Sequence, residues 1–362
     1  MNLSRRGLLA SSLALAACDR RLDTSTAQAA PTRPVRPLRD LAPFPFGTQL
    51  ISTELATPVI AQLAGQHFDQ VNTGFELKME YIVQPDGRLR FEGGDRLATF
   101  CRDHDQALHA HTLIWYADTP AWFERLDGSR RAMEAAFDGY IREVAGRYAG
   151  RARAWDVVNE PVTDEGSSLR DSLWSRNLGQ DGHFIRAFEL AHEADPAAIL
   201  FTNDYNLESN PTKRRTFLHL VERMMTRGVP IGGIGTQCHV SVDLPRGALT
   251  TAMRDIASLG LPVHVSEFDC SLVPDGAFSG STSDREAAQI RLYQEAIESF
   301  AALPSRQQYG FTVWGVRDTE SWLRRTDWGG DPNDRPLLFD DAGRPKPVFW
   351  AVAEALERSS RD

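Results

Sequence analysis

Two glutamates at the ends of strand-like runs are of the residue type that performs acid–base chemistry. Glu160 follows the apolar run at residues 155–158, and Glu267 lies near the end of a second run at residues 261–266. In a (β/α)8 barrel, catalytic groups lie where the parallel strands end. Two carboxyl groups there predict glycoside hydrolysis, in which one protonates the leaving oxygen and the other attacks the sugar or activates water. A single glutamate at a strand end usually faces solvent or caps a helix, so the neighbouring residues must decide.

The elements that would carry these glutamates alternate along the chain. From residue 43 onward, short apolar runs alternate with helical patterns, which predicts repeated β/α units. The predicted strands span residues 46–50, 70–75, 110–115, 154–158, 199–202, 233–237, 263–266 and 310–314. The predicted helices span residues 58–68, 97–108, 133–148, 184–194, 212–227, 249–258, 285–301 and 347–358. This order predicts an α/β fold, a single-domain (β/α)8 TIM barrel over residues 41–362.

Length and charge agree with a large acidic domain. The chain has 362 residues, of which 42% are hydrophobic and 25% charged, enough to bury the core of one barrel. The formal charge is −9, but residues 1–40 hold seven Arg and three Asp, so the remainder carries −13. An acidic body argues against nucleic acid and anionic membranes as partners and favours a neutral substrate.

Residues 1–40 are predicted to be a targeting segment and tether, and not part of the fold. Residues 4–9 (SRRGLL) resemble a bacterial twin-arginine export signal, and the apolar run after them is too short to span a bilayer. Residues 15–18 (LAAC) resemble a lipobox, which predicts an export signal over residues 1–18, a lipid on Cys18 and a disordered tether over residues 19–40. The expected location is periplasmic, anchored to the bacterial inner membrane. The alternative is an ordinary cleaved signal peptide in which Cys18 has no role.

Sugar-binding side chains gather at the other predicted strand ends. Aromatic rings can stack on the apolar faces of pyranose rings, while amides and histidines hydrogen-bond to hydroxyls. One such aromatic alone would be assigned to the core, but several clusters at strand ends favour a binding cleft. The candidates are His111, Trp115, Tyr205, Asn206, Gln237, His239, Trp314 and Trp322.

Three further cysteines lie within the predicted barrel. Cys101 falls in a helical stretch and is expected in the core. Cys238 and Cys270 follow strand-end residues on neighbouring strands, so a disulfide between them stays an open alternative. No ligand-spaced His, Cys or carboxylate cluster and no Gly-rich phosphate loop predicts a metal or organic cofactor.

Six segments carry a resemblance to one known family. They are WDVVNEP (155–161), NDYN (203–206), GVPIGGIGTQCHV (228–240), LPVHVSEFD (261–269), FTVWGVRDTESW (311–322) and PLLFDDAGRPKP (336–347). They resemble the signatures of glycoside hydrolase family 10, the endo-β-1,4-xylanases, and the match runs from about residue 46 to residue 355. The resemblance implies a (β/α)8 barrel that cleaves xylan with retention of anomeric configuration.

The same resemblance implies roles for individual residues. Glu160 resembles the general acid/base and Glu267 the nucleophile, while His239 and Asp269 resemble the pair that orients the nucleophile. Asn159 resembles the residue that binds the 2-hydroxyl of the sugar being cleaved, a contact that strengthens in the transition state. The substrate-binding positions implied are Glu76, His111, Trp115, Tyr205, Asn206, Gln237, Trp314 and Trp322, with Tyr205 and Asn206 on the leaving-group side.

The chain departs from the family pattern on the glycon side. The family segment Glu-Asn-x-Met-Lys-Trp is replaced by ELKMEY (76–81), so Leu77 stands for an Asn and Glu80 for a Lys. Asp118 stands for a Gln after the third strand. A Glu in place of a Lys exchanges donors for acceptors and disfavours an acidic sugar. Lys78 would substitute only in part, because adjacent positions of a strand face opposite sides. The alternative is a register one residue off or a rearranged loop.

Three functional hypotheses follow. The first is a retaining endo-β-1,4-xylanase-like hydrolase of xylan or xylooligosaccharides. The second is a retaining β-glycosidase of the same fold with altered glycon specificity, for a decorated xylooligosaccharide, an aryl β-xyloside or another β-linked sugar. The third, from another class, is a sugar-binding lipoprotein without turnover. Oligomeric state and endo or exo action have no signal in the sequence.

Overall fold

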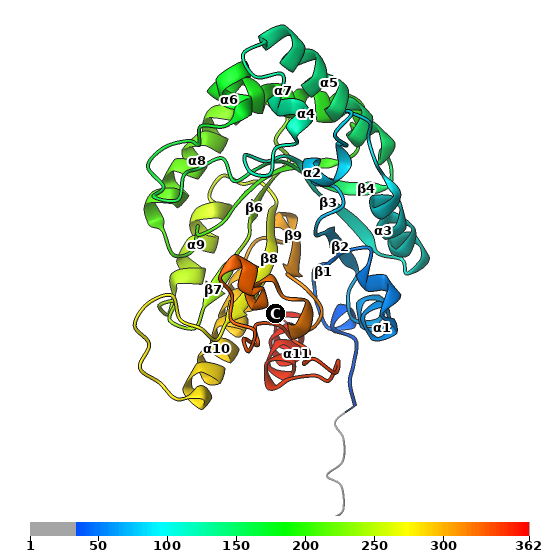
Figure 1. Cartoon of the computed structure of the whole chain (residues 1–362). Helices are drawn as coiled ribbons and strands as arrows, with labels where there is room; N and C mark the ends of the chain where they lie inside the picture. Colours follow the sequence, from blue (N-terminus) through cyan, green and yellow to red (C-terminus); the bar gives the residue numbers. More distant parts are fainter. Residues whose placement is uncertain (1–33, 362) are drawn as a thin grey trace, which may run out of the picture. The chain divides into compact units, whose positions relative to one another are not determined.

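Eight parallel strand positions close into a barrel in the computed structural model, which describes residues 34–361. Each strand pairs in parallel with the next around the ring, and β9 closes it onto β1 through Phe46↔Phe311. The strands are β1 (Phe46–Leu50), β2 (Gln70–Thr73), β3 (Ala107–Ile114), β4 (Ala152–Asn159), β5 (Ile199–Asp204), β6 (Gly233–Thr236), β7 (His239–Ser241), β8 (Val263–Ser271) and β9 (Gln308–Val313). Since β6 and β7 both pair with β8, they share one barrel position. The predicted (β/α)8 barrel is confirmed (Figure 1).

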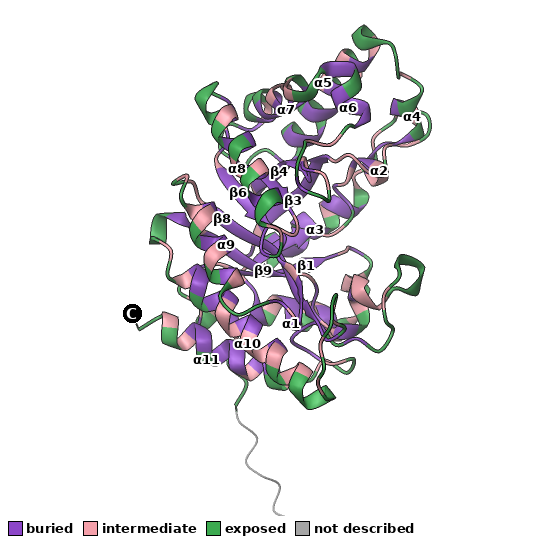
Figure 2. Cartoon of the chain, turned by 90° about the vertical axis from the view of Figure 1, so that its left-hand side faces the viewer, coloured by how far each residue is buried: buried purple, intermediate pink, exposed green. Residues whose placement is uncertain are grey.

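Helices surround the strands, and the strands are the buried centre (Figure 2). The helices are α1 (Pro58–His67), α2 (Met79–Ile82), α3 (Glu92–Asp103), α4 (Ala121–Glu124), α5 (Arg130–Arg147), α6 (Leu173–Leu178), α7 (Gln180–Ala194), α8 (Pro211–Thr226), α9 (Ala248–Ala257), α10 (Thr282–Ala301) and α11 (Pro347–Ser359). Several start at clear sequence signals. Asn210 caps α8 by accepting from two backbone N–H groups, and Ser281 forms a capping box at α10.

The predicted export signal, Cys18 and most of the predicted tether lie outside the described residues. Within residues 34–361, no helix has both the length and the apolar character needed to cross a membrane. Cys101, Cys238 and Cys270 are all buried free thiols, so the structure contains no disulfide between Cys238 and Cys270.

Two elements differ most from the sequence prediction, by five residues at a boundary. The helix predicted at residues 97–108 is α3, which begins five residues earlier and ends before β3. Its first turn contains Gly94, where a Cβ would lie 2.3 Å from the Tyr148 hydroxyl. Because glycines occupy closely packed positions in the first turn of α3, that turn lacks the apolar periodicity that predicts a helix. The strand predicted to end at residue 266 continues to Ser271, because β7 pairs with it.

The interior of the barrel holds a buried polar network. The Asp156 carboxylate lies 3.1 Å from His109 Nε2 and 2.8 Å from His111 Nδ1, and all three side chains are almost fully buried. Burial alone would raise the pKa of Asp156, but the two histidines hold it well below its usual range. This network fixes the orientation of His111 below the site.

Candidate active site

A cleft of about 1110 Å³ lies at the ends of the strands. The loops after the barrel strands line it, as the C-terminal face of this fold predicts. Most of the residues singled out from the sequence meet there. They are Lys78, Glu80, His111, Trp115, Asp118, Asn159, Glu160, Tyr205, Asn206, Gln237, His239, Glu267, Asp269, Trp314 and Trp322.

The backbone of Glu160 is strained and held from both sides. Glu160 follows β4 and precedes Pro161, with φ of 56°, a region that few residues other than glycine adopt. Its N–H donates to the carbonyl of Asn203 at 2.7 Å, and its carbonyl accepts from Arg170 Nε at 3.1 Å. Surrounding groups therefore fix a conformation that the chain alone would not favour.

The carboxyl group of Glu160 accepts from three donors. Trp115 Nε1 donates to Oε2 at 2.8 Å, and Gln237 Nε2 and Asn159 Nδ2 donate to Oε1 at 2.8 and 3.2 Å. Only 8% of the residue surface is exposed. Strand ends on three different elements thus orient one carboxyl toward the cleft.

Glu267 is held by an amide and an imidazole. Asn203 Nδ2 donates to its Oε1 at 2.9 Å, and His239 Nε2 lies 3.4 Å from its Oε2. The other nitrogen of His239 lies 3.0 Å from Asp269, whose carboxylate also accepts from Trp322 Nε1 at 2.8 Å. Burial by itself lowers the pKa of His239, but the charges of Asp269 and Glu267 raise it to about 10. At neutral pH a cation therefore lies beside the carboxyl group of Glu267.

Asn203 contacts both catalytic candidates. Its backbone carbonyl accepts from Glu160 and its side-chain amide donates to Glu267. Ser266 fixes the amide orientation by donating to Asn203 Oδ1 at 2.9 Å. Gly235, opposite it on β6, leaves room for the side chain, since a Cβ there would lie 2.5 Å from Oδ1. The sequence prediction had placed Asn203 at a strand end but gave it no role.

A second polar cluster borders the cleft beside Glu160. Arg170 Nη2 donates to the Tyr205 hydroxyl and to Asp164, both at 2.6 Å. The Arg170 guanidinium also lies 4.1 Å from the centroid of the Tyr116 ring. Arg170 therefore joins the backbone of Glu160 to Tyr205, which the resemblance placed on the leaving-group side. Sequence reasoning missed Arg170, because its loop position carries no strand-end signal.

Two predicted glycon-side residues lie elsewhere. Glu76 is 2% exposed and does not line the cleft; its carboxylate accepts from the backbone N–H of Ser52. Leu77 is fully buried in the hydrophobic core. Both predicted positions are therefore corrected, because this segment turns inward before α2.

Lys78, Glu80 and Asp118 do reach the cleft. The Lys78 ammonium lies 4.5 Å from the centroid of the Trp115 ring. Lys78 immediately precedes α2 and is not in a strand, so the alternation of strand positions, which was expected to limit its substitution for the missing Lys, does not apply. The pKa of Glu80 is raised, first by partial burial and then by the charge of Asp118.

In the part of the chain that the structure describes, no group of three or more His, Cys, Asp or Glu side chains is arranged to hold a metal ion. The cleft presents two carboxyl groups and the donors that orient them.

The barrel and its pair of oriented carboxyl groups define a glycoside hydrolase of the (β/α)8 class. Residues 39–355 match the family model of Glycosyl hydrolase family 10, and the chain belongs to that family.

Relatives with known names are similar over most of this chain. It is 33% identical to "Exoglucanase XynX" of Acetivibrio thermocellus over 86% of its length, 31% identical to "Endo-beta-1,4-xylanase Xyn10C" of Cellvibrio japonicus over 91%, and 33% identical to "Endo-1,4-beta-xylanase B" of Paenibacillus barcinonensis over 84%. The aligned region is 28%, 59% and 92% of those proteins.

Solved structures of xylanases have the same fold as this chain. Native xylanase10C from Cellvibrio japonicus superposes with a TM-score of 0.83 at 30% identity, covering 90% of this chain and 73% of that one. Native xylanase 10B from Thermotoga maritima superposes with a TM-score of 0.81 at 27% identity, covering 90% and 99%.

Proposed function

We propose that this chain is a retaining endo-β-1,4-xylanase that cleaves xylan or xylooligosaccharides by double displacement. The observation that carries the proposal is the shared contact of Asn203 with Glu160 and Glu267, which holds two carboxyl residues close together in one open cleft. Retaining enzymes need their carboxyl groups about 5–5.5 Å apart, closer than inverting enzymes do. The xylanase names of several relatives support the substrate class.

Each step of the reaction has a residue suited to it. Glu267, beside the His239 imidazolium, attacks the anomeric carbon, while Glu160 gives its proton to the leaving oxygen. The covalent glycosyl–enzyme is then hydrolysed by a water that Glu160 deprotonates, so the configuration is retained. We infer from the family resemblance that Asn159, which donates to Glu160, binds the sugar 2-hydroxyl as charge develops on the ring.

The test is hydrolysis of linear xylohexaose by the full chain, with product sizes followed by chromatography and the first-formed anomer by NMR. Internal cleavage that releases the β-anomer supports the proposal. Release of the α-anomer would contradict double displacement, and release of xylose alone from one end would contradict endo action. Turnover that is lost in both Glu160→Ala and Glu267→Ala would eliminate the third hypothesis, a sugar-binding protein without catalysis.

A second candidate function, the retaining β-glycosidase with altered glycon specificity, is favoured by the charges of the cleft. Glu80 and Asp118 stand where the family has a Lys and a Gln, and both line the cleft. Glu80→Lys with Asp118→Gln is expected to raise kcat/KM on plain xylan by roughly 10-fold, as one or two restored hydrogen bonds would. Leu77→Asn should be left out, since it would bury an amide in the core. An unchanged ratio of activities on xylan and on aryl β-glycosides would count against this candidate.

We also infer export and lipid anchoring from the resemblance of residues 4–18 to a twin-arginine signal with a lipobox. In a bacterial host, the full chain should incorporate labelled palmitate and fractionate with the inner membrane. Cys18→Ala should lose the label. Labelling that persists in Cys18→Ala would refute the assignment, and a soluble, unlabelled product that is shortened at its N-terminus would support an ordinary cleaved signal.

A further inference from the structure

Large apolar side chains are exposed inside the cleft, away from the catalytic pair. Among residues 34–361, five large apolar side chains are exposed, in the cleft or elsewhere: Val35, Phe75, Met225, Val273 and Trp328. Phe75, Val273 and Trp328 line the cleft, and Trp328 is the most exposed, at 61%. Exposed apolar surface within a binding cleft marks a place where a ligand binds.

Val273 and Trp328 belong to the same part of the cleft. Val273 follows β8 and Trp328 lies in the loop after β9, and these two strands are neighbours in the barrel. We call the part of the cleft between these loops the β8–β9 arm. It is lined by Ser271, Val273, Asp275, Arg325, Trp328, Gly329, Gly330, Asp331 and Asp334.

The loop that carries Trp328 is held tightly. The backbone N–H of Gly330 donates to Arg325 O at 2.9 Å, and that of Asp331 donates to Leu323 O at 3.0 Å. A Cβ at Gly330 would lie 2.2 Å from Leu323 O, so only glycine fits this crossing. The indole is therefore presented by a preformed turn, which lowers the entropic cost of binding.

One face of the Trp328 ring is already covered. The Arg325 guanidinium lies 4.0 Å from the ring centroid, and Asp327 holds Arg325 through two hydrogen bonds of 3.3 and 2.6 Å. The large exposure of Trp328 is thus on the remaining part of the indole. A planar apolar surface of this kind suits the apolar face of a sugar ring.

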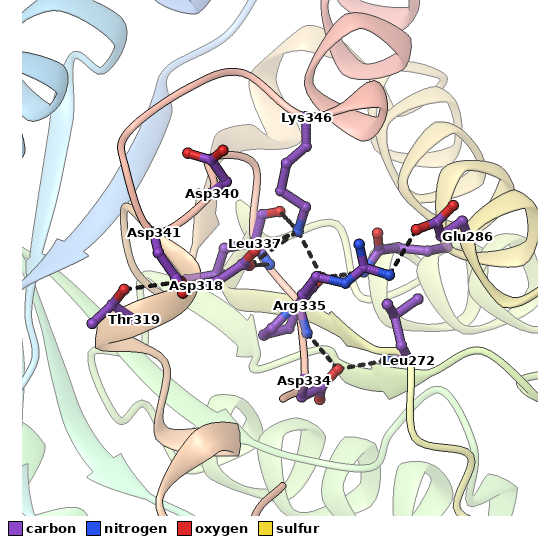
Figure 3. Close-up of polar contacts among 12 residues, drawn as sticks. Leu272, Glu286, Asp318, Thr319, Asp334, Arg335, Leu337, Asp340, Asp341 and Lys346 are labelled. Atoms are coloured by element: carbon purple, nitrogen blue, oxygen red, sulfur yellow. Dashed lines mark hydrogen bonds and ion pairs between the residues drawn. The ribbon is translucent and has the colours of Figure 1, made fainter. Parts of the chain in front are cut away.

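The base of the arm is fixed to the barrel. Asp334 accepts from Ser271 Oγ at 2.6 Å. It also accepts from the Leu272 N–H at 2.9 Å (Figure 3), which joins the two loops. Further along the loop, Lys346 lies 2.9 Å from Asp318 and donates to two backbone carbonyls. These contacts fix the loop after β9 at the base of the arm.

The charges of the arm select a neutral ligand. Asp275, Asp331 and Asp334 contribute three carboxyl groups, and the single cation in the lining, Arg325, is paired with Asp327. An anionic group would meet uncompensated like charge there. Carboxylates accept hydrogen bonds from hydroxyl groups, which a neutral sugar supplies.

We propose that the β8–β9 arm is an additional sugar subsite in which Trp328 stacks on a neutral sugar ring beyond the rings at the scissile bond. The proposal rests on the proposed xylanase function. The ring belongs either to the xylan main chain or to a neutral branch, since both present the same apolar face and hydroxyls.

The test compares Trp328→Ala with the wild type on three substrates: an aryl β-xylobioside, linear xylohexaose and arabinoxylan. We expect kcat/KM to fall roughly tenfold on a substrate that reaches the arm, the usual effect of losing an aromatic stacking contact, and to stay unchanged on the aryl xylobioside. Trp328→Phe should recover part of the loss. Met225→Ala, which removes an exposed apolar side chain on α8 outside the cleft, is the control.

The substrates separate the two sources of the ring. A loss on xylohexaose assigns the arm to the main chain, and a loss confined to arabinoxylan assigns it to a branch. Equal losses on all three substrates, or no loss on any, would overturn the subsite. A wild type that hydrolyses no xylose-based substrate would instead refute the proposed function, so the two failures are distinguishable.

Discussion

Arg170→Met is expected to impair general acid catalysis more than nucleophilic attack. Arg170 donates to the carbonyl of Glu160, whose positive φ depends on such support, and it also donates to Tyr205. It makes no contact with Glu267 in the structure. Methionine keeps an apolar stem over the Tyr116 ring but supplies no donor.

The contacts of Arg170 set the size of the effect. A hydrogen bond that involves a charged group contributes about 1.5–3 kcal/mol. If the loss appears fully in the transition state, kcat/KM falls roughly 10- to 100-fold on substrates whose leaving group needs protonation. Substrates with acidic phenols as leaving groups need little help from Glu160, so their loss should be only a few-fold.

The assay is a series of aryl β-xylobiosides whose leaving groups span a range of pKa values. The plot of log kcat/KM against leaving-group pKa should be steeper for Arg170→Met than for the wild type, and Arg170→Lys should lie between them. Arg142→Met, which removes an exposed cation on α5 that pairs with Glu193, is the control. An equal loss across the series, with an unchanged slope, would refute the reasoning and assign Arg170 a purely structural role.

Three further outcomes are expected. Glu267→Ala should lose roughly 10⁴-fold or more in turnover on every substrate, while Glu160→Ala should lose far less on activated aryl glycosides; equal losses there would contradict the division of roles. The pKa of His239 is raised from its ordinary value of 6.5 to about 10 in the fold, so the stability that this shift contributes is fully present below about pH 6.5 and is lost as the pH rises to about 10. Urea unfolding of wild type and His239→Gln should therefore converge in stability with rising pH, and parallel curves would exclude the linkage. Lys213→Met leaves a buried carboxylate without its 2.9 Å partner and should cost about 3–5 kcal/mol of unfolding free energy, whereas Arg358→Met, in an exposed pair, should cost at most about 1 kcal/mol; similar costs would contradict the role of burial.

Much of the fold could be predicted because the strands of a barrel have short, mostly apolar sequences. All eight strand positions were found, since buried parallel strands leave a local signal. The three residues of β7 were not, because their strand pairing depends on β8 and not on their own sequence. The start of α3 was missed for a related reason, as its Gly94 is selected by a neighbouring side chain and not by helix propensity.

The site was predictable where a residue follows a strand directly. Glu160 and Gln237 lie in the cleft for that reason. Glu76 was wrongly predicted to line the cleft. The segment after β2 turns inward, and no periodic pattern in the sequence predicts such a turn. Asp156 was read only as part of a strand, because its role depends on histidines of the adjacent strand.

The double contact of Asn203 couples the positions of the two glutamates. Asn203 acts as a spacer between the two residues, because its backbone carbonyl accepts from the backbone N–H of Glu160 and its side-chain amide donates to the carboxyl group of Glu267. The separation of the two carboxyl groups decides the stereochemistry of hydrolysis. A mutation that displaces either glutamate alone therefore also breaks a contact of the spacer. The relative position of the two glutamates therefore depends on one asparagine and on Gly235, which makes room for its side chain.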